Sequence, residues 1–116
     1  MLLVKWELLE ERIVARHVKT FLDIVVLAML NGNPMYGYKL IAAVHKEFGV
    51  LLSPGSLYPL LHSLEDNKLI GSRFQGGKIV YAVTANGKKK FQDVFMAYKM
   101  AIRKMENFIK FHGEAS

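Results

Sequence analysis

Residues 36–84 read YGYKLIAAVHKEFGVLLSPGSLYPLLHSLEDNKLIGSRFQGGKIVYAVT, and they predict most of the architecture. The first part predicts a helix over residues 36–48 that ends at Gly49, a residue suited to the left-handed conformation at a helix terminus. Ser53 followed by Pro54 predicts a second helix start, because a serine oxygen can cap free N–H groups and proline is tolerated in the first turn. Leucines at helical spacing then predict one buried stripe, made of Leu57, Leu60, Leu61 and Leu64.

The second part of this segment predicts a β-hairpin. We expect Asn67 to take the left-handed conformation and to end the second helix. Residues 69–74 and 79–84 resemble two strands, and Gly76-Gly77 between them can supply the positive φ angles of a tight turn. A helix pair followed by a hairpin is typical of a winged helix-turn-helix, whose second helix usually enters a DNA groove. The predicted fold class is therefore mainly α with a small β-hairpin (α+β).

Capping residues predict two more helices, one on each side of this segment. Thr20 offers an N-cap, with Asp23 three residues on, for a buried helix over residues 21–30. Thr84 can cap a long final helix over residues 85–111. We expect the chain to divide into an N-terminal helix (1–19), a winged helix-turn-helix domain (20–84) and a C-terminal dimerisation helix (85–116).

The C-terminal helix carries an apolar seam with the heptad spacing of a coiled coil. The seam residues are Phe91, Phe95, Tyr98, Ile102, Met105 and Ile109. A helix predicted over residues 2–17 carries a second apolar stripe, made of Leu2, Trp6, Leu9 and Ile13. We predict that these two helices form a homodimer interface, which would present two recognition helices to a pseudo-palindromic site. The alternative is that the C-terminal helix packs back on its own domain.

The composition favours an acidic partner and gives little support to catalysis. The 116 residues include 16 Lys or Arg and 10 Asp or Glu, a net charge of +6, and residues 68–90 contain no acid. Hydrophobic residues make up 52%, more than so short a chain buries easily, which favours an oligomer. With no cysteine and no metal-ligand spacing among the four histidines, we expect no enzyme, no metal and no cofactor.

Targeting signals are weak in this chain. The most apolar run, residues 21–30, contains Asp23 and is about half the length that a membrane span requires. The acidic and basic residues near the N-terminus are incompatible with the apolar core of a secretory signal. We therefore expect a soluble cytoplasmic protein with no membrane partner.

Candidate contacts with double-stranded DNA lie at two helix starts and at the hairpin. Small residues at the start of the second helix would let its backbone approach a phosphate, and side chains away from the leucine stripe could reach base edges. Arg73 and Lys78 flank the hairpin turn and should reach phosphates or the minor groove. For Tyr36, packing in the core is the alternative. The full predicted set is Tyr36, Tyr38, Lys39, Ser53, Pro54, Gly55, Ser56, Tyr58, Pro59, His62, Arg73, Gln75, Gly76, Gly77 and Lys78.

Two other binding roles are compatible with the residues. A small flat aromatic effector could occupy an apolar gap at the dimer axis lined by Trp6, Met96, Tyr98 and Met100, because methionine adapts to irregular shapes and aromatic rings stack. The alternative is that these four residues form ordinary interface core. The winged helix could also be a protein–protein interaction module without specific DNA binding.

The sequence resembles the PadR-like family of prokaryotic winged-helix regulators. The resemblance rests on residues 36–40 (YGYKL), on residues 53–61 (SPGSLYPLL) with Leu64-Glu65, and on Leu69-Ile70, residues 78–81 (KIVY), Thr84 and Gly87. It implies a dimeric repressor with the C-terminal helix in the dimer interface, often relieved by small phenolic or drug-like molecules. Two features depart from the family pattern: Asn67 stands where glycine is usual, and the wing is short and carries few basic residues.

Overall fold

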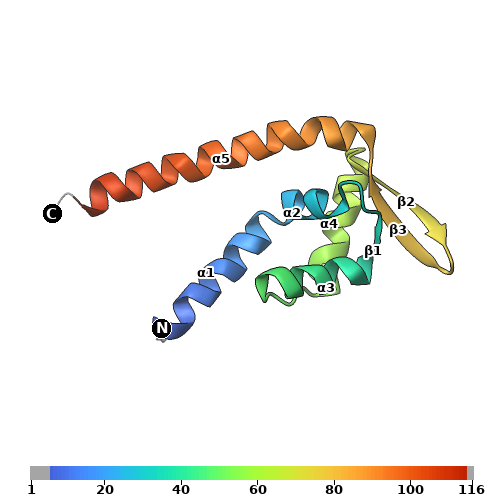
Figure 1. The fold of residues 1–116 in the computed structure, drawn as a ribbon, viewed down its shortest axis with the longest axis horizontal. Coiled ribbons are helices and arrows are strands. Elements are labelled where there is room, and N and C mark those ends of the chain that lie inside the picture. The colour runs from blue at the N-terminus through green and yellow to red at the C-terminus, as the bar shows by residue number, and fades with distance from the viewer. Residues whose placement is uncertain (1–5, 115–116) are drawn as a thin grey trace.

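The computed structural model describes residues 6–114 and contains five helices and three strands in that range (Figure 1). In chain order they are α1 (Trp6–Thr20), α2 (Leu22–Leu30), β1 (Met35–Tyr36), α3 (Gly37–Phe48), α4 (Pro54–Asp66), β2 (Ile70–Gln75), β3 (Lys78–Val83) and α5 (Ala85–Gly113). The predicted fold class, mainly helical with a winged helix and a long C-terminal helix, is confirmed. None of the described helices is long and apolar enough to cross a membrane.

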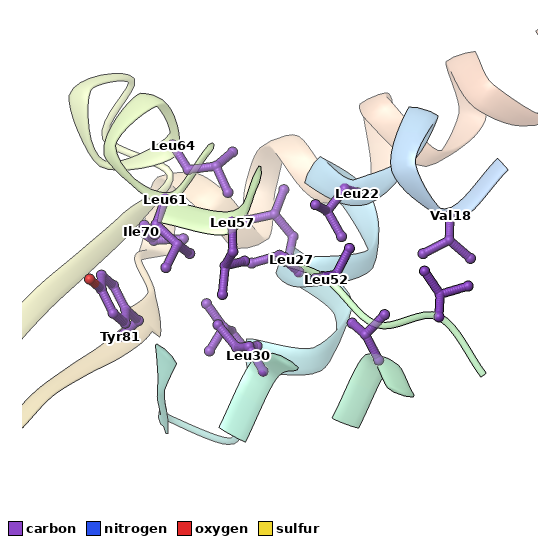
Figure 2. Close-up of a cluster of buried hydrophobic side chains, with 14 residues drawn as sticks. Val18, Leu22, Leu27, Leu30, Leu52, Leu57, Leu61, Leu64, Ile70 and Tyr81 are labelled. Carbon is purple, nitrogen blue, oxygen red and sulfur yellow. The ribbon is translucent and has the colours of Figure 1, made fainter. Parts of the chain in front are cut away.

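The core lies where α2, α3 and α4 meet the sheet. α2 is apolar on nearly every side, and Leu27 and Leu30 from it are almost completely buried. Leu57 and Leu61 from α4 meet them from the opposite side, as Figure 2 shows. Burial of apolar side chains is the main favourable contribution to folding, so this cluster fixes where α4 stands relative to the wing.

The sheet has three antiparallel strands in the order β1-β3-β2. The sequence predicted only the two hairpin strands and placed Tyr36 at the start of a helix, and this prediction is wrong at Tyr36. Met35 pairs with Tyr81 and Tyr36 pairs with Val80. Tyr36 is therefore extended and occupies the N-cap position of α3, without a side-chain cap hydrogen bond. A strand of two residues is too short to leave a periodic pattern, which explains why it was missed.

Three predicted helix ends are confirmed. The Ser53 side chain accepts a hydrogen bond from the Ser56 N–H, with Pro54 in the first turn of α4. The Thr84 side chain accepts a hydrogen bond from the N–H three residues on, at the start of α5. Gly49 ends α3 in the left-handed conformation, with φ of 70°.

Two other predicted caps are wrong, although α4 does end at Asn67 as predicted. Thr20 does not cap α2, because α1 continues through it and its hydroxyl donates to the Arg16 carbonyl. Asn67 is not left-handed, with φ of −84°, and the left-handed residue is Lys68, with φ of 64°. The N–H groups of Lys68 and Leu69 donate back to the last turn of α4, a pattern that requires the left-handed residue to follow the C-cap.

The hairpin formed by β2 and β3 projects from the domain at the end opposite to the free ends of α1 and α5 (Figure 1). Gly76 and Gly77 form its turn with φ angles of 59° and 79°, which confirms the predicted tight turn. We call residues 70–83 the wing. Because β1 pairs only with residues 80 and 81, the outer part of the wing has no third strand beside it.

Helix α5 begins against the domain and then leaves it (Figure 1). At Gly87 the helix passes very close to Leu69, the residue before β2. A Cβ atom added at Gly87 would overlap the Leu69 carbonyl oxygen. The last anchor is Tyr98, whose hydroxyl donates to the Asp23 carboxylate of α2 at 2.7 Å. Its ring also meets Phe21 edge-on, with centroids 4.6 Å apart. Every described residue after Tyr98 is exposed.

Candidate DNA-binding surface

Helix α4 separates its side chains into a buried face and an exposed face. Leu57, Leu61 and Leu64 are buried against the core. The exposed face carries predicted contact residues, namely Ser53, Pro54, Gly55, Ser56, Pro59 and His62. The small residues at the helix start, Ser53 to Ser56, leave the backbone accessible. A phosphate or a groove edge requires this arrangement.

The start of α4 is held by a pair of serine hydroxyls. Ser53 Oγ accepts from the Ser56 N–H at 3.1 Å, and the Ser53 hydroxyl also donates to Ser56 Oγ at 3.1 Å. The hydroxyl of Ser56 is therefore oriented by its neighbour while it stays exposed. Such a group can donate to a phosphate oxygen without first losing a free rotamer.

Helix α3 approaches α4 closely at Gly37. A Cβ atom there would lie 2.5 Å from the Tyr58 hydroxyl oxygen, so a larger residue at this position would require the Tyr58 ring to move. Tyr58 is half-buried in this contact, unlike its exposed neighbours on α4. The hydroxyl end of the ring is the part that lies against Gly37, so the DNA contact at Tyr58 stays a prediction.

A cluster of two tyrosines and two lysines joins α3 to the wing. The rings of Tyr36 and Tyr38 stack with centroids 5.7 Å apart and an interplanar angle of 6°. The Lys78 ammonium lies 5.4 Å from the Tyr36 ring centroid and 4.8 Å from that of Tyr38, and the Lys39 ammonium lies 5.9 Å from Tyr36. These distances are in the range of cation–π attraction, so the wing lysine is positioned by aromatic rings before any ligand arrives.

The two faces of the wing differ in chemistry. Arg73, Gln75 and Lys78 lie on one face, since Gln75 pairs with Lys78 and Arg73 pairs with Val80. Phe74 pairs with Ile79 on the other face, and both side chains are exposed. Neither Phe74 nor Ile79 is among the residues predicted to contact DNA. Their alternation with the polar residues is visible in the sequence, but their exposure depends on where the core ends.

The acidic side chain of Glu65 is close to the wing and is hydrogen-bonded within the protein. Glu65 of α4 accepts a hydrogen bond from the Ser72 hydroxyl of β2. Burial, together with the nearby Tyr58 and Glu65, raises the pKa of Tyr81 above its usual value of 10.0. Tyr81 is buried and packs as part of the core.

Three of the four residues predicted for an effector pocket have described side chains, and these three do not form a pocket within one chain. Tyr98 packs against Phe21, Met96 and Met100 are exposed, and the side chain of Trp6 lies outside the described part. An apolar hollow of about 380 Å³ lies nearby instead, between α1, α2 and the end of α3. Its lining consists of Ile13, Val14, His17, Val18, Phe21, Val25 and Phe48.

The predicted dimer residues fall into three groups. Phe95, Ile102, Met105 and Ile109 of α5 are exposed. Phe91 and Tyr98 are half-buried in their own chain, as are Leu9 and Ile13 of α1. Leu2 lies outside the described residues.

In the part of the chain that the structure describes, no group of His, Asp and Glu could hold a metal ion.

The helix pair, the exposed face of α4 and the projecting wing define a winged helix-turn-helix protein. The family model described as "Transcriptional regulator PadR-like family" matches residues 26–93, more than half of the chain. The chain therefore belongs to the PadR-like family of transcriptional regulators. It is a regulator and not an enzyme, and its winged helix is of the DNA-binding kind. A comparison with curated proteins finds no match.

Solved structures of similar proteins share this fold. A PadR family transcriptional regulator from Eggerthella lenta is 22% identical, with 96% of this chain and 97% of that chain covered and a TM-score of 0.78. A PadR-like transcriptional regulator from Bacillus cereus is 25% identical, with 81% and 96% covered and a TM-score of 0.69. F93 from STIV, a winged-helix DNA-binding protein, is 27% identical, with 71% and 89% covered and a TM-score of 0.59.

Proposed function

We propose that this protein is a homodimeric repressor that binds a pseudo-palindromic operator in double-stranded DNA. The observation that carries the proposal is the apolar surface on the outer half of α5. This surface is exposed in the single chain and is made of Met100, Ile102, Met105, Phe108, Ile109 and Phe111. Large exposed apolar patches usually mark interaction sites, and a helix with a heptad seam is suited to a second copy of itself.

The dimer would pair α5 with its copy and bring α1 to the same interface. In Figure 1 both helices extend from the winged domain on the side opposite to the wing. A two-fold axis through them would leave both copies of α4 and both wings free. Two recognition helices related by two-fold symmetry match half-sites about one turn of duplex apart.

Each protomer would place α4 in the major groove. The exposed residues at its start would meet phosphates and base edges, and His62 about two turns further on would face the same groove. Lys78, held above the Tyr36 and Tyr38 rings, would bind phosphate at the wing. A lysine positioned in this way loses less side-chain freedom on binding than a free surface lysine.

A small aromatic effector would relieve repression by altering the angle between α5 and the winged domain. The predicted pocket of Trp6, Met96, Tyr98 and Met100 would form only at the dimer axis. The hollow beside Phe21 adds a neighbouring apolar space, and Phe21 touches the Tyr98 ring. A ligand there would act on the contact that anchors α5 to α2. The protein would work in the cytoplasm, where prokaryotic DNA is accessible.

The alternative function is a protein-interaction module that uses the same face. Binding of a polyanion releases counterions, so the affinity for DNA falls steeply with salt, whereas a protein interface of mixed character has little such slope. The two functions therefore differ in a directly measurable quantity.

The experiment is a salt titration of duplex binding by the wild type and by Lys78→Ala. The duplexes are the DNA upstream of the protein's own gene and a random-sequence control. We expect tighter, salt-sensitive binding to the upstream DNA and a slope that Lys78→Ala reduces by about one unit. Equal binding to both duplexes without a salt slope would refute DNA regulation and favour the protein-interaction module.

A further inference from the structure

The wing carries an exposed apolar pair for which the proposed function gives no role. Phe74 and Ile79 are cross-strand partners one pair away from the Gly76-Gly77 turn. Phe74 is 77% exposed and Ile79 is 49% exposed. Single apolar residues on a surface are common, but two in contact positions near the tip of a projecting hairpin form a defined apolar edge.

The strand register shows which way this pair faces. Side chains alternate along a strand, so Phe74 and Ile79 share a face with Ser72 and its partner Tyr81. Tyr81 is buried in the core, and Ser72 donates to Glu65 of α4. The apolar pair therefore lies on the α4 side of the wing, as an outward continuation of the core face.

Ile79 also borders a hollow that contains predicted DNA contacts. This hollow, of about 300 Å³, lies between the wing and the starts of α3 and α4, and is lined by Tyr36, Gly37, Tyr38, Tyr58, Lys78, Ile79 and Tyr81. Four tyrosines and one lysine line it together with Ile79. That combination suits a sugar–phosphate backbone, whose phosphates take the polar groups while the sugars lie on apolar atoms.

The charge and the shape of the wing favour DNA as the occupant over a protein. Residues 68–90 contain no acidic side chain, so the wing as a whole attracts a polyanion, while Glu65 of α4, on the same side as the pair, is hydrogen-bonded to Ser72. Gly76 and Gly77 leave the tip without side chains, so the backbone of the turn can approach a groove closely.

We propose that Phe74 and Ile79 form an apolar wedge that enters the minor groove of the bound duplex and kinks it at one base step. Phenylalanine and isoleucine are among the side chains that partly unstack base steps in this way. The inference rests on the proposed DNA-binding function and adds a source of sequence preference to it. Because flexible pyrimidine–purine steps kink at lower cost, the wedge would favour such a step without any hydrogen bond to its bases.

The wedge and the wing lysine affect binding differently. Insertion of an apolar side chain displaces no counterion, so loss of Phe74 should weaken binding at every salt concentration by the same factor. Loss of Lys78 should instead reduce the slope of affinity against salt by about one unit. The two residues lie on opposite faces of the same hairpin, so this contrast separates their roles.

The experiment uses a duplex selected by the wild-type protein from a random-sequence pool. Binding is followed by fluorescence anisotropy over a salt series, and bending by energy transfer between dyes on the duplex ends. Phe74→Ser removes the wedge, Phe74→Leu keeps it apolar, and Lys78→Ala serves as the comparison for slope. Thermal unfolding of each variant verifies that the exposed position tolerates the change.

We expect Phe74→Ser to weaken binding about tenfold with an unchanged salt slope and to straighten the duplex. Phe74→Leu should retain most of both properties. Wild-type affinity should fall when a stiff A-tract replaces the base step at the wing, and Phe74→Ser should be much less sensitive to that change.

Several results would overturn the wedge while leaving the regulator in place. One is salt-sensitive binding of a straight duplex by the wild type, and another is normal binding and bending by Phe74→Ser. Loss of self-association by Phe74→Ser without DNA would show that the pair covers a second copy instead. Absence of salt-sensitive duplex binding by the wild type would overturn the proposed function, and the wedge with it.

Discussion

The winged domain and the outer half of α5 use similar residues in opposite surroundings. In the winged domain, large apolar side chains such as Leu40, Leu57 and Leu61 are almost completely buried. On α5 beyond Tyr98, equally apolar side chains such as Met105 and Ile109 are mostly exposed. The winged domain thus buries these apolar side chains within the single chain, whereas the outer half of α5 leaves its own exposed. We attribute this difference to a second copy of the chain.

The boundary between the two regions is a short set of contacts around α2. Gly87 fits against the Leu69 carbonyl, and Tyr98 reaches both Phe21 and Asp23. These contacts fix the direction in which α5 leaves the domain. In the proposed dimer they would therefore also set the distance between the two copies of α4.

The largest expected effect separates the two regions by stability. Leu57→Ala leaves a cavity in the core and should lower the free energy of unfolding by about 2–5 kcal/mol. Met105→Ala should leave the midpoint of urea unfolding much less changed at low protein concentration, where the chain is monomeric. Urea titrations at two protein concentrations measure both effects. Equal losses for the two variants at low concentration would mean that α5 is part of the core.

Much of the winged domain could be predicted from local signals. The Ser53-Pro54 start, the Gly49 end and the Thr84 cap depend on neighbours within a few residues, and all three were predicted correctly. Strand β1 could not be predicted, since its two residues become a strand only by pairing with β3. The capping roles predicted for Thr20 and Asn67 were wrong for a related reason.

Those two failures show the limits of cap rules. Thr20 has a suitable side chain, but α1 continues through it, and Asp23 is hydrogen-bonded to the distant Tyr98 instead. The left-handed residue after α4 is Lys68 and not Asn67, because the hydrogen bonds that close the helix determine the position. Residue type alone would have chosen the asparagine.

The candidate site divides in the same way. Most of the α4 surface followed from the leucine stripe, since residues off the stripe had to be exposed. The position of Lys78 above two stacked tyrosines could not be predicted, because it joins elements far apart in the sequence. The exposure of Phe74 was equally hidden, since its face is buried at Ile70 and open only further out.

A glycine pair gives an intermediate effect at the boundary. Gly87→Ala would force a Cβ atom against the Leu69 carbonyl oxygen, a backbone atom that cannot move aside alone, and should cost about 1–3 kcal/mol. Gly113→Ala, near the other end of α5, meets nothing within 4 Å and serves as the matched control. Thermal unfolding of both variants measures the difference. A neutral Gly87→Ala would show that α5 does not approach β2 so closely.

The smallest expected effect concerns the hydrogen bond that anchors α5. Burial, followed by the hydrogen bond to Asp23, raises the pKa of Tyr98 from 10.0 to about 12. A raised pKa in the folded state means that the neutral hydroxyl stabilises the fold below pH 10, and that this stabilisation disappears as the pH rises from 10 to 12. Tyr98→Phe should therefore lower the melting temperature by a few degrees at pH 8 and by less as the pH rises.

A double-mutant cycle isolates this contact. In an Asp23→Ala background, Tyr98→Phe should produce a smaller change in melting temperature with a weaker pH dependence, because the acceptor is gone and only burial still raises the pKa of Tyr98. A pH dependence as strong as in the wild-type background would mean that Asp23 does not contribute to the raised pKa.

Sedimentation velocity of the free chain and of its complex with a selected duplex shows directly whether the protein is a dimer and binds DNA as one. We expect the wild type to sediment as a dimer and to place two chains on each duplex. Met105→Glu, which puts a charge on the exposed face of α5, should sediment as a folded monomer with much weaker duplex binding. A wild type that is monomeric both free and on DNA, with Met105→Glu binding equally well, would contradict the proposed dimer.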